Sequence, residues 1–292
     1  MKDEFITANQ VPHLANYMSR ALRSLVSILT AVPVQTTKPA RPQGISVYMR
    51  VKDERDWIEP SISSICGIAD EIIVVDNGST DGTYELLTEM SASSQGQIRL
   101  WREPGLKFVA LSNFALAQTR LRWVFRWDGD MVAHTDGEHP ITALRSRILA
   151  LHPKRYYLIY LRHINLSGDL FHQDQQEMVH IEEYIHTFSP SARFMHTGWF
   201  EAVKFPLYYQ PLFWYEPYAF HVNIKPGRRM LLRYFWNDWL EHKEYDRYST
   251  LEDYVRTRIE KEFGTPLLEE AQTKCVERAL QNHIPFDQKR FA

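Results

Sequence analysis

The chain lacks the features that mark secreted and membrane-spanning proteins. Its only two cysteines, Cys66 and Cys275, lie far apart and fit no metal-ligand spacing, so they suit free thiols in a reducing compartment. It has no apolar run of about 18 residues, the length that a membrane-spanning helix needs. Its first ten residues lack the charged-then-apolar order of a signal peptide. We therefore expect a cytoplasmic protein.

An excess of one charge is also missing. The sequence has 34 basic and 36 acidic residues, which gives a net charge of −2. A general nucleic-acid binder usually shows a basic excess or a basic stripe, so we expect no nucleic-acid partner. Any anionic ligand must then be held by a few local side chains. The apolar content of 44% is ordinary for a globular chain.

The first 43 residues form an appendage to the predicted domain. From Met18 to Val32 the leucines and valines follow helical spacing, and residues 33–42 are rich in Pro and Thr, as in a linker. Packing of this helix against its own domain is the favoured interpretation. Contact with the inner face of a membrane and homodimer formation are the alternatives.

Strands and helices alternate from residue 44 to residue 127. The continuous β-branched run from Glu71 to Val75 indicates a strand that is buried on both faces, as in a parallel sheet. The alternation predicts an α/β fold with a doubly wound, mostly parallel, Rossmann-like sheet. The expected strands are Gly44–Val51, Glu71–Val75, Ile98–Trp101 and Trp123–Trp127, and the expected helices are Trp57–Ile68, Thr83–Met90 and Ser112–Thr119.

The pattern changes after about residue 140. We expect long strands at Tyr156–His163 and Ala192–Phe205, followed by helices at Arg229–Leu240, Leu251–Phe263 and Leu267–Leu280. These elements predict four segments: an N-terminal helix and linker (1–43), a nucleotide-binding half (44–140), an acceptor-binding half (141–248) and a C-terminal helical extension (249–292).

Polar clusters follow three of the predicted strands. They are Arg50 to Glu54, Asp76 to Ser79, and Asp128 to Asp130. Ligands of open parallel sheets bind at the carboxyl ends of the strands, so we expect the three clusters to meet at one edge. Two aspartates as close as Asp128 and Asp130 repel each other unless a cation lies between them, and hard divalent cations prefer oxygen ligands. A solvated Asp-Gly-Asp turn is the alternative.

Asp76 ends the second predicted strand. Its carboxylate could accept a hydrogen bond from a nucleotide base or a ribose hydroxyl. The alternative is a tight strand-to-helix turn in which Asp76 caps backbone N–H groups, and that arrangement is common.

The stretch from Ile45 to Leu87 resembles the opening of family 2 glycosyltransferases. The specific match is VVDNGSTDGT, Val74 to Thr83, and the likeness covers roughly Gly44 to Val132. It implies a GT-A fold, a nucleoside-diphosphate sugar donor, and Mn²⁺ or Mg²⁺ as cofactor. The positions matching the family's donor-binding residues are Arg50, Lys52, Glu54 and Asp76, with Asp128 and Asp130 as the metal-binding pair.

The chain departs from the family pattern at two places. Asn77 stands where the family usually has a second Asp, and Leu111-Ser112-Asn113 stands where it has an Ala-Arg-Asn element. The missing Arg removes a donor contact, for which Lys107 is the candidate replacement. Both departures bear on how the nucleotide is held.

His221 is the candidate for a late metal ligand. Related GT-A enzymes often supply a His near the end of the domain, and here Lys225 follows His221 and is a candidate for holding the diphosphate. The alternative is an ordinary histidine, one of 12 in the chain.

An inverting transfer needs a carboxylate that takes the proton of the acceptor hydroxyl. Glu201 has aromatic neighbours that could stack on a sugar and is preferred; Glu216 and Glu183 are the alternatives. The predicted function is therefore the metal-dependent, inverting transfer of a sugar from a nucleoside-diphosphate donor to a hydroxyl of a glycan or lipid-linked acceptor, as in polysaccharide biosynthesis. The rivals are a non-catalytic nucleotide-sugar-binding protein and a sugar-phosphate nucleotidyltransferase, whose Gly-rich phosphate loop is absent from Met49 to Arg55.

Overall fold

The computed structural model describes residue 25 and residues 41–174, 180–197, 200–242, 244–281 and 283–285. The predicted helix from Met18 to Val32 lies outside the described residues apart from Leu25. The chain forms two compact units. The first runs to Ile164 and resumes from Val179 to His221, and the second comprises Asn165–Met178 and Val222–Phe291.

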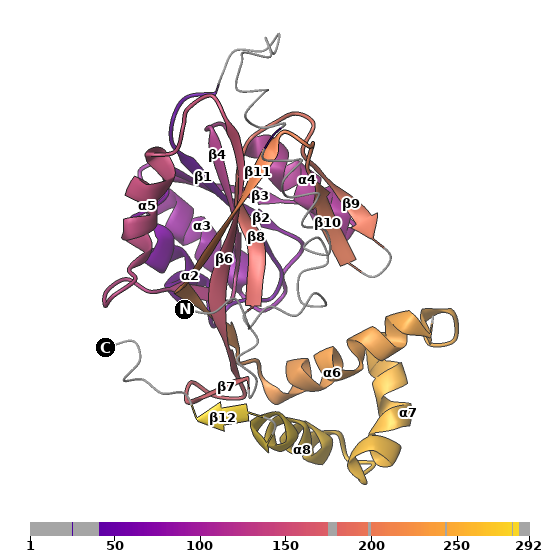
Figure 1. Ribbon diagram of the computed structural model, residues 1–292. Helices are drawn as coiled ribbons and strands as arrows, with labels where there is room; N and C mark the ends of the chain where they lie inside the picture. The colour runs from indigo at the N-terminus through magenta and orange to yellow at the C-terminus, as the bar shows by residue number, and fades with distance from the viewer. Residues whose placement is uncertain are drawn as a thin grey trace. The chain divides into compact units, whose positions relative to one another are not determined.

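The first unit is built on four parallel strands in the order β3-β2-β1-β4, joined by helices (Figure 1). The predicted alternation of strands and helices is confirmed. The elements are β1 (Ile45–Val51), α2 (Ile58–Ile65), β2 (Glu71–Asp76), α3 (Thr83–Ser93), β3 (Ile98–Arg102), α4 (Phe108–Gln118) and β4 (Trp123–Asp128).

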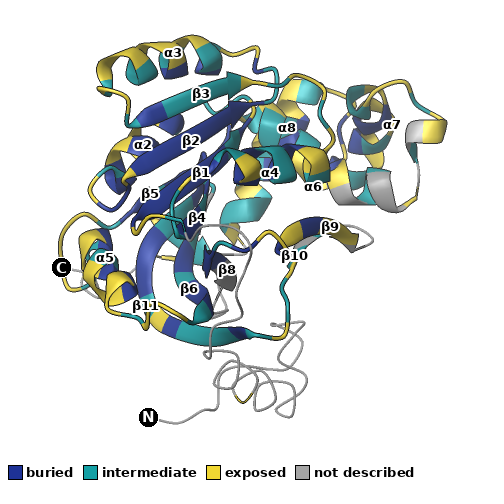
Figure 2. Cartoon of the chain, turned by 90° about the horizontal axis from the view of Figure 1, so that it is seen from above, coloured by how far each residue is buried: buried dark blue, intermediate teal, exposed yellow. Residues whose placement is uncertain are grey.

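Both faces of this sheet are covered. Every residue of β2 is buried, as its β-branched run predicts, and Figure 2 shows β1, β2 and β4 in the buried colour. Helices α2, α3 and α5 (Ile141–Leu149) pack on one face with Val47, Val74 and Phe125. On the other face α4 and a hairpin pack against Tyr48 and Val75.

The sheet continues with antiparallel strands, so it is mixed, with a parallel core. β8 (His180–Thr187) pairs with β4, and β6 (Tyr156–Ser167) pairs with β8. The long strand β11 (Tyr209–Asn223) pairs with β6 and with the short β5 (Met131–Ala133). The parallel pairs β1–β2, β1–β4 and β2–β3 form the core of this mixed α/β sheet, in agreement with the predicted fold class.

The single strand predicted for Ala192–Phe205 is instead a hairpin. Residues Arg193–Thr197 form β9 and Phe200–Lys204 form β10, and the two strands pair antiparallel. The chain therefore reverses where the sequence pattern indicated a continuous strand.

The second unit is mainly helical, with its own core. Its elements are β7 (His172–Asp174), α6 (Gly227–Glu241), a 3₁₀ turn (Glu244–Asp246), α7 (Leu251–Phe263), α8 (Leu268–Gln281) and β12 (His283–Pro285). The three predicted helices are thus confirmed. Leu231, Phe235, Tyr254 and Phe263 are among the buried side chains that join α6, α7 and α8.

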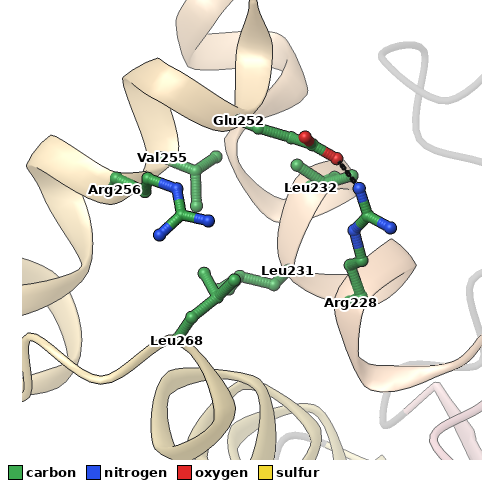
Figure 3. A pocket seen from close by; sticks show the side chains of 7 residues that line it. All are labelled: Arg228, Leu231, Leu232, Glu252, Val255, Arg256 and Leu268. Atoms are coloured by element: carbon green, nitrogen blue, oxygen red, sulfur yellow. Dashed lines mark hydrogen bonds and ion pairs between the residues drawn. The ribbon is translucent and has the colours of Figure 1, made fainter.

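A cavity of about 160 Å³ lies among these three helices (Figure 3). Its apolar wall includes Leu231, Val255 and Leu268, and Arg228 pairs with Glu252 beside it.

The boundaries of the two compact units differ from the segment boundaries predicted at residues 140 and 248. The functional roles of the predicted segments stay predictions. None of the helices in the described part of the chain is long and apolar enough to cross a bilayer.

Candidate active site

The strand register brings the predicted polar clusters to one edge of the sheet. Val51 lies opposite Asp76 in the β1–β2 pair, and Arg50 lies opposite Asp128 in the β1–β4 pair. Asp76 in turn lies opposite Arg102 of β3. Because all of these strands are parallel, their carboxyl ends share this edge, as the sequence predicted.

The Asp128-Gly129-Asp130 segment turns the chain from β4 into β5. The side chain of Asp128 is 29% exposed, and that of Asp130 is 9% exposed. Ser61 of α2 holds this turn, because its hydroxyl donates to the carbonyl of Asp128 (3.1 Å) and accepts from Nε1 of Trp127 (3.0 Å). No local sequence pattern indicates this role of Ser61.

Glycine at position 129 leaves room for Glu54. A Cβ built on Gly129 would lie 3.1 Å from Cγ and 3.3 Å from Cβ of Glu54. The Glu54 side chain, which follows β1, therefore packs against the turn between the two aspartates. The backbone N–H of Glu54 donates to Oγ1 of Thr83 (2.9 Å). This places Glu54 in the predicted site, in contact with the turn.

His221 lies beside Asp130, as the metal-ligand hypothesis requires. The antiparallel pairing of β11 with β5 sets His221 opposite Met131, and its Nε2 is 3.3 Å from Oδ1 of Asp130. The ring of His163 contacts the His221 ring edge-on, with centroids 5.6 Å apart. Pairing of strands that are about 90 residues apart in sequence thus assembles the Asp130–His221 pair.

A divalent cation fits this pair in spacing and ligand type. Two neighbouring ligands of a cation bound at about 2.1 Å lie about 3 Å apart, close to the separation of Oδ1 of Asp130 and Nε2 of His221. Among the described residues no group of three or more His, Cys, Asp or Glu side chains is arranged to hold a cation. Mg²⁺ sites are commonly completed by phosphate oxygens and water, so two protein ligands with Asp128 nearby are compatible with such a cation.

Arg50 and Glu201 form a buried ion pair at the same edge. Their side chains are 8% and 5% exposed. One oxygen of Glu201 contacts the guanidinium of Arg50, and the other accepts a hydrogen bond from the Ser112 hydroxyl of α4 at 2.5 Å. The Arg50 guanidinium also lies 3.8 Å from Oδ1 of Asp128. The predicted base is therefore in the site, with both carboxylate oxygens in contact with other protein side chains.

Asp76 holds the turn that follows β2. Its carboxylate is fully buried and accepts from the backbone N–H groups of Gly78 (3.0 Å) and Ser79 (3.1 Å). Nε of Arg102, which sequence analysis did not single out, is 3.7 Å from it. This is the capping geometry named as the alternative; contact of Asp76 with a nucleotide stays a prediction.

Asn77 joins the same turn to the loop before α4. Its Oδ1 accepts from the N–H of Gly105 (3.0 Å) and its Nδ2 donates to the carbonyl of Leu106 (3.3 Å). Both ends of the amide are used, which an Asp side chain at this position could not reproduce, because a carboxylate only accepts.

The predicted basic residues lie in different places. Lys52 is exposed directly after β1, and Lys107 is exposed directly before α4. Lys225 is buried in the second unit, between β11 and α6. Their binding of phosphate stays a prediction.

The alternative bases do not join the Asp130–His221 pair in the described contacts. Glu216 of β11 pairs with Arg147 of α5 at 3.2 Å. Partial burial acts to raise the pKa of Glu216, but its backbone hydrogen bond and the Arg147 charge outweigh this and lower the pKa. Glu183 lies in β8, and its side chain is outside the described part of the chain.

Comparison with known proteins points to one family. Residues 46–141 match the family model described as Glycosyl transferase family 2. An uncharacterised glycosyltransferase of Rickettsia typhi is 31% identical over 116 residues, 40% of this chain and 36% of that protein. One of Rickettsia bellii is 34% identical over 86 residues, 30% of this chain and 27% of that protein. The chain thus spans about a third of the length of these relatives.

Solved structures with a similar arrangement are distant. A mannosyltransferase from Pyrobaculum calidifontis in complex with GDP-Man and Mn²⁺ is 13% identical, with a TM-score of 0.42; the match covers 89% of this chain and 84% of that one. S. aureus TarS 1-349 in complex with UDP-GlcNAc is 18% identical, with a TM-score of 0.35, covering 44% of this chain and 36% of that one.

Proposed function

We propose, from the premise that residues 46–141 form a family 2 glycosyltransferase domain, that this protein is a metal-dependent glycosyltransferase. It transfers a sugar from a nucleoside-diphosphate donor to an acceptor hydroxyl, with inversion. The observation that carries the proposal is the approach of Asp130 and His221 to 3.3 Å beside Asp128, at the carboxyl edge of the parallel strands.

In this proposal Asp130 and His221 would hold a Mn²⁺ or Mg²⁺ ion, and Asp128 of the same turn would add negative charge beside it. The cation, when bound, neutralises charge on the departing diphosphate. The protein's own share is to fix the two aspartates: Ser61 holds the carbonyl of Asp128, and Glu54 packs against Gly129. Fixed charges aimed at a developing charge are the main source of such stabilisation.

The donor is proposed to lie along the ends of β1 and β2, near Arg50, Lys52, Glu54, Asp76 and Asn77. The turn after β2 gives it a rigid border, since Asp76 and Asn77 are both held by backbone groups. Lys107 and Lys225 are proposed for the diphosphate. The acceptor is proposed to be a glycan or a lipid-linked sugar in the cytoplasm or at the inner face of a membrane.

The test begins with donor binding. The protein is titrated with UDP-, GDP- and dTDP-sugars, with and without Mn²⁺, and slow donor hydrolysis is followed. We expect at least one donor to bind in a Mn²⁺-dependent way and to be hydrolysed. If no nucleotide sugar binds under either condition, the proposal is wrong.

A matched pair of variants separates the enzyme from a non-catalytic binding protein. Asp130→Asn removes a charge from the proposed cation site, whereas Asp136→Asn removes one from an exposed loop. We expect Asp130→Asn to reduce donor hydrolysis by about 100-fold or more, in line with the loss of a group that stabilises the transition state. Asp136→Asn is expected to match the wild type. Tight donor binding without turnover in the wild type would favour the non-catalytic alternative.

A further inference from the structure

The Arg50–Glu201 pair places a positive charge directly beside a proposed cation site. Nη2 of Arg50 is 3.8 Å from Oδ1 of Asp128, and its guanidinium lies over the ring of Phe108, 4.5 Å from the centroid. With a side-chain exposure of 8%, Arg50 is largely screened from water. A charge in such surroundings acts strongly on its neighbours.

Glu201 is bound on both sides. One oxygen contacts Arg50 and the other contacts the Ser112 hydroxyl, which is also 2.9 Å from the carbonyl of Phe108. A base must come within about 3 Å of the oxygen whose proton it takes. The Glu201 side chain is 5% exposed and contacts one residue of β1 and one of α4, so its surroundings fit a structural partner of Arg50.

The charges of the site explain why such a partner is needed. Asp128 and Asp130 carry two negative charges, which match a divalent cation. An uncompensated Arg50 would cancel part of this attraction, because like charges repel across a poorly solvated site. With Glu201 beside it, Arg50 is neutralised and its guanidinium still contacts Asp128.

We infer that Glu201 is a positioning residue that neutralises Arg50, so that Arg50 orients Asp128 without weakening the binding of a divalent cation. The inference rests on the proposed function and departs from the assignment of Glu201 as the base. It couples hairpin β9–β10, which carries Glu201, to the aspartate turn after β4.

Direct measurement of Mn²⁺ affinity by electron paramagnetic resonance tests this without any turnover. Glu201→Gln keeps the size of the side chain and one accepting oxygen, replaces the other oxygen by an NH2 donor, and removes the charge. We expect it to weaken Mn²⁺ binding by about tenfold or more, since a buried charge then acts on Asp128 unopposed. Arg50→Gln removes the positive charge beside Asp128 and is expected to bind Mn²⁺ more tightly than Glu201→Gln does. The double variant Arg50→Gln/Glu201→Gln is expected to recover the affinity to within about threefold.

Two controls address folding. Glu71→Gln removes the charge from another partly buried pair, Glu71–Arg99, whose atoms are 3.0 Å apart in β2 and β3; it is expected to lower stability and to leave Mn²⁺ affinity unchanged. Ser112→Ala removes a contact of Glu201 without changing any charge, and is expected to shift the affinity by less than about threefold. Thermal melts of every variant identify any that has lost its fold. If a single variant does not fold, the Mn²⁺ affinity of the double variant, which leaves neither charge unpaired, tests the inference.

The outcomes are distinct. If Glu201→Gln binds Mn²⁺ and donor like the wild type but loses sugar transfer, Glu201 is the base and the inference is wrong. If the double variant is as weak as Glu201→Gln, charge neutralisation is not its role. If the wild type itself binds neither Mn²⁺ nor a nucleotide sugar, the proposed function fails, and the inference fails with it.

Discussion

At the scale of single residues, Asp128 and Asp130 differ although one glycine separates them. Asp128 lies near the guanidinium of Arg50, and Asp130 lies near the imidazole of His221. Each carboxylate therefore has a basic group beside it before any ligand arrives, which reduces the repulsion between them. The Asp-x-Asp spacing places the two carboxylates close together. Arg50 of β1 then lies beside Asp128, and His221 of β11 lies beside Asp130.

Gly129 is predicted to be required for its lack of a side chain. In Gly129→Ala the new Cβ would lie 3.1 Å from Cγ of Glu54, so the turn or Glu54 must shift. We expect a loss of about 1–3 kcal/mol in unfolding free energy, typical of overpacking, together with weaker Mn²⁺ binding, measured by denaturant unfolding and by titration.

Gly67→Ala is the matched control, because its Cβ would meet Cγ2 of Thr142 at 3.0 Å, away from the aspartate turn. It should lower stability and leave Mn²⁺ affinity unchanged. Equal Mn²⁺ affinity in Gly129→Ala and the wild type would contradict a role of this turn in cation binding.

Some of these residue contacts follow from the sequence and others do not. Asp128 and Asp130 are predictable because they come directly after a buried strand, where parallel sheets bind ligands. The Arg50–Glu201 pair joins residues 151 positions apart, and no local pattern specifies which distant carboxylate will reach a given arginine. Asp76 is a third case. The sequence pattern identifies it as a polar residue at the end of a strand, but this placement fits both contact with a ligand and capping of the turn.

At the scale of elements, the parallel core is the part that the sequence predicts best. Its strands are short, continuous apolar runs between helices. Such runs are typical of strands that are buried on both faces of a parallel sheet. The hairpin β9–β10 was missed because its two strands read as one alternating stretch. The pairing of β11 with β5 was also beyond the sequence, since antiparallel partners separated by many residues carry no local signal of their register.

Strand β8 carries a histidine that should make stability depend on pH. His186 is 2% exposed, and burial, with the charges of Arg41 and Arg126, lowers its pKa to about 3 from an ordinary value of 6.5. Between those two values the unfolded chain binds a proton that the folded chain does not, so unfolding free energy falls as pH falls through this window. Burial lowers the pKa of His134 to about 4 in the same direction.

We predict that His186→Phe reduces this acid sensitivity. Each fully titrating group contributes a slope of at most about 1.4 kcal/mol per pH unit, and the variant removes one such group while keeping a ring near Phe205, whose centroid is 5.0 Å away. The measurement is unfolding free energy at several pH values from 7 down to 4.5. Parallel curves for variant and wild type would show that His186 does not titrate in this way.

At the scale of the whole molecule, the chain combines two compact units with separate cores. The first holds the sheet and the aspartate turn, and the second holds α6, α7 and α8 around Leu231 and Phe235. With a net charge of −2, the protein has no overall field that would attract an anionic donor. Binding of the proposed anionic donor would then depend on local groups, among which the buried Arg50–Glu201 pair lies beside Asp128 at the sheet edge.

This organisation predicts that the helical unit can be destabilised separately. Gly168 has φ +83°, and a Cβ there would lie 2.6 Å from Cδ2 of Leu280. Gly168→Ala therefore combines backbone strain of about 1–2 kcal/mol with overpacking of about 1–3 kcal/mol. Gly264→Ala, after α7, is the matched control, because Gly264 also has positive φ (+67°) but nothing lies within 4 Å of its Cβ.

Calorimetry with and without Mn²⁺ and a bound donor distinguishes the two units. We expect Gly168→Ala to lower the transition of the helical unit by more than Gly264→Ala does, and to leave the ligand-stabilised transition of the sheet unit in place. At a ligand concentration of about 100 times Kd, binding should stabilise that unit by about 2.7 kcal/mol in both variants. A single transition that shifts as a whole in Gly168→Ala would mean instead that the two units unfold together, and that the helices contribute directly to the stability of the donor-binding sheet.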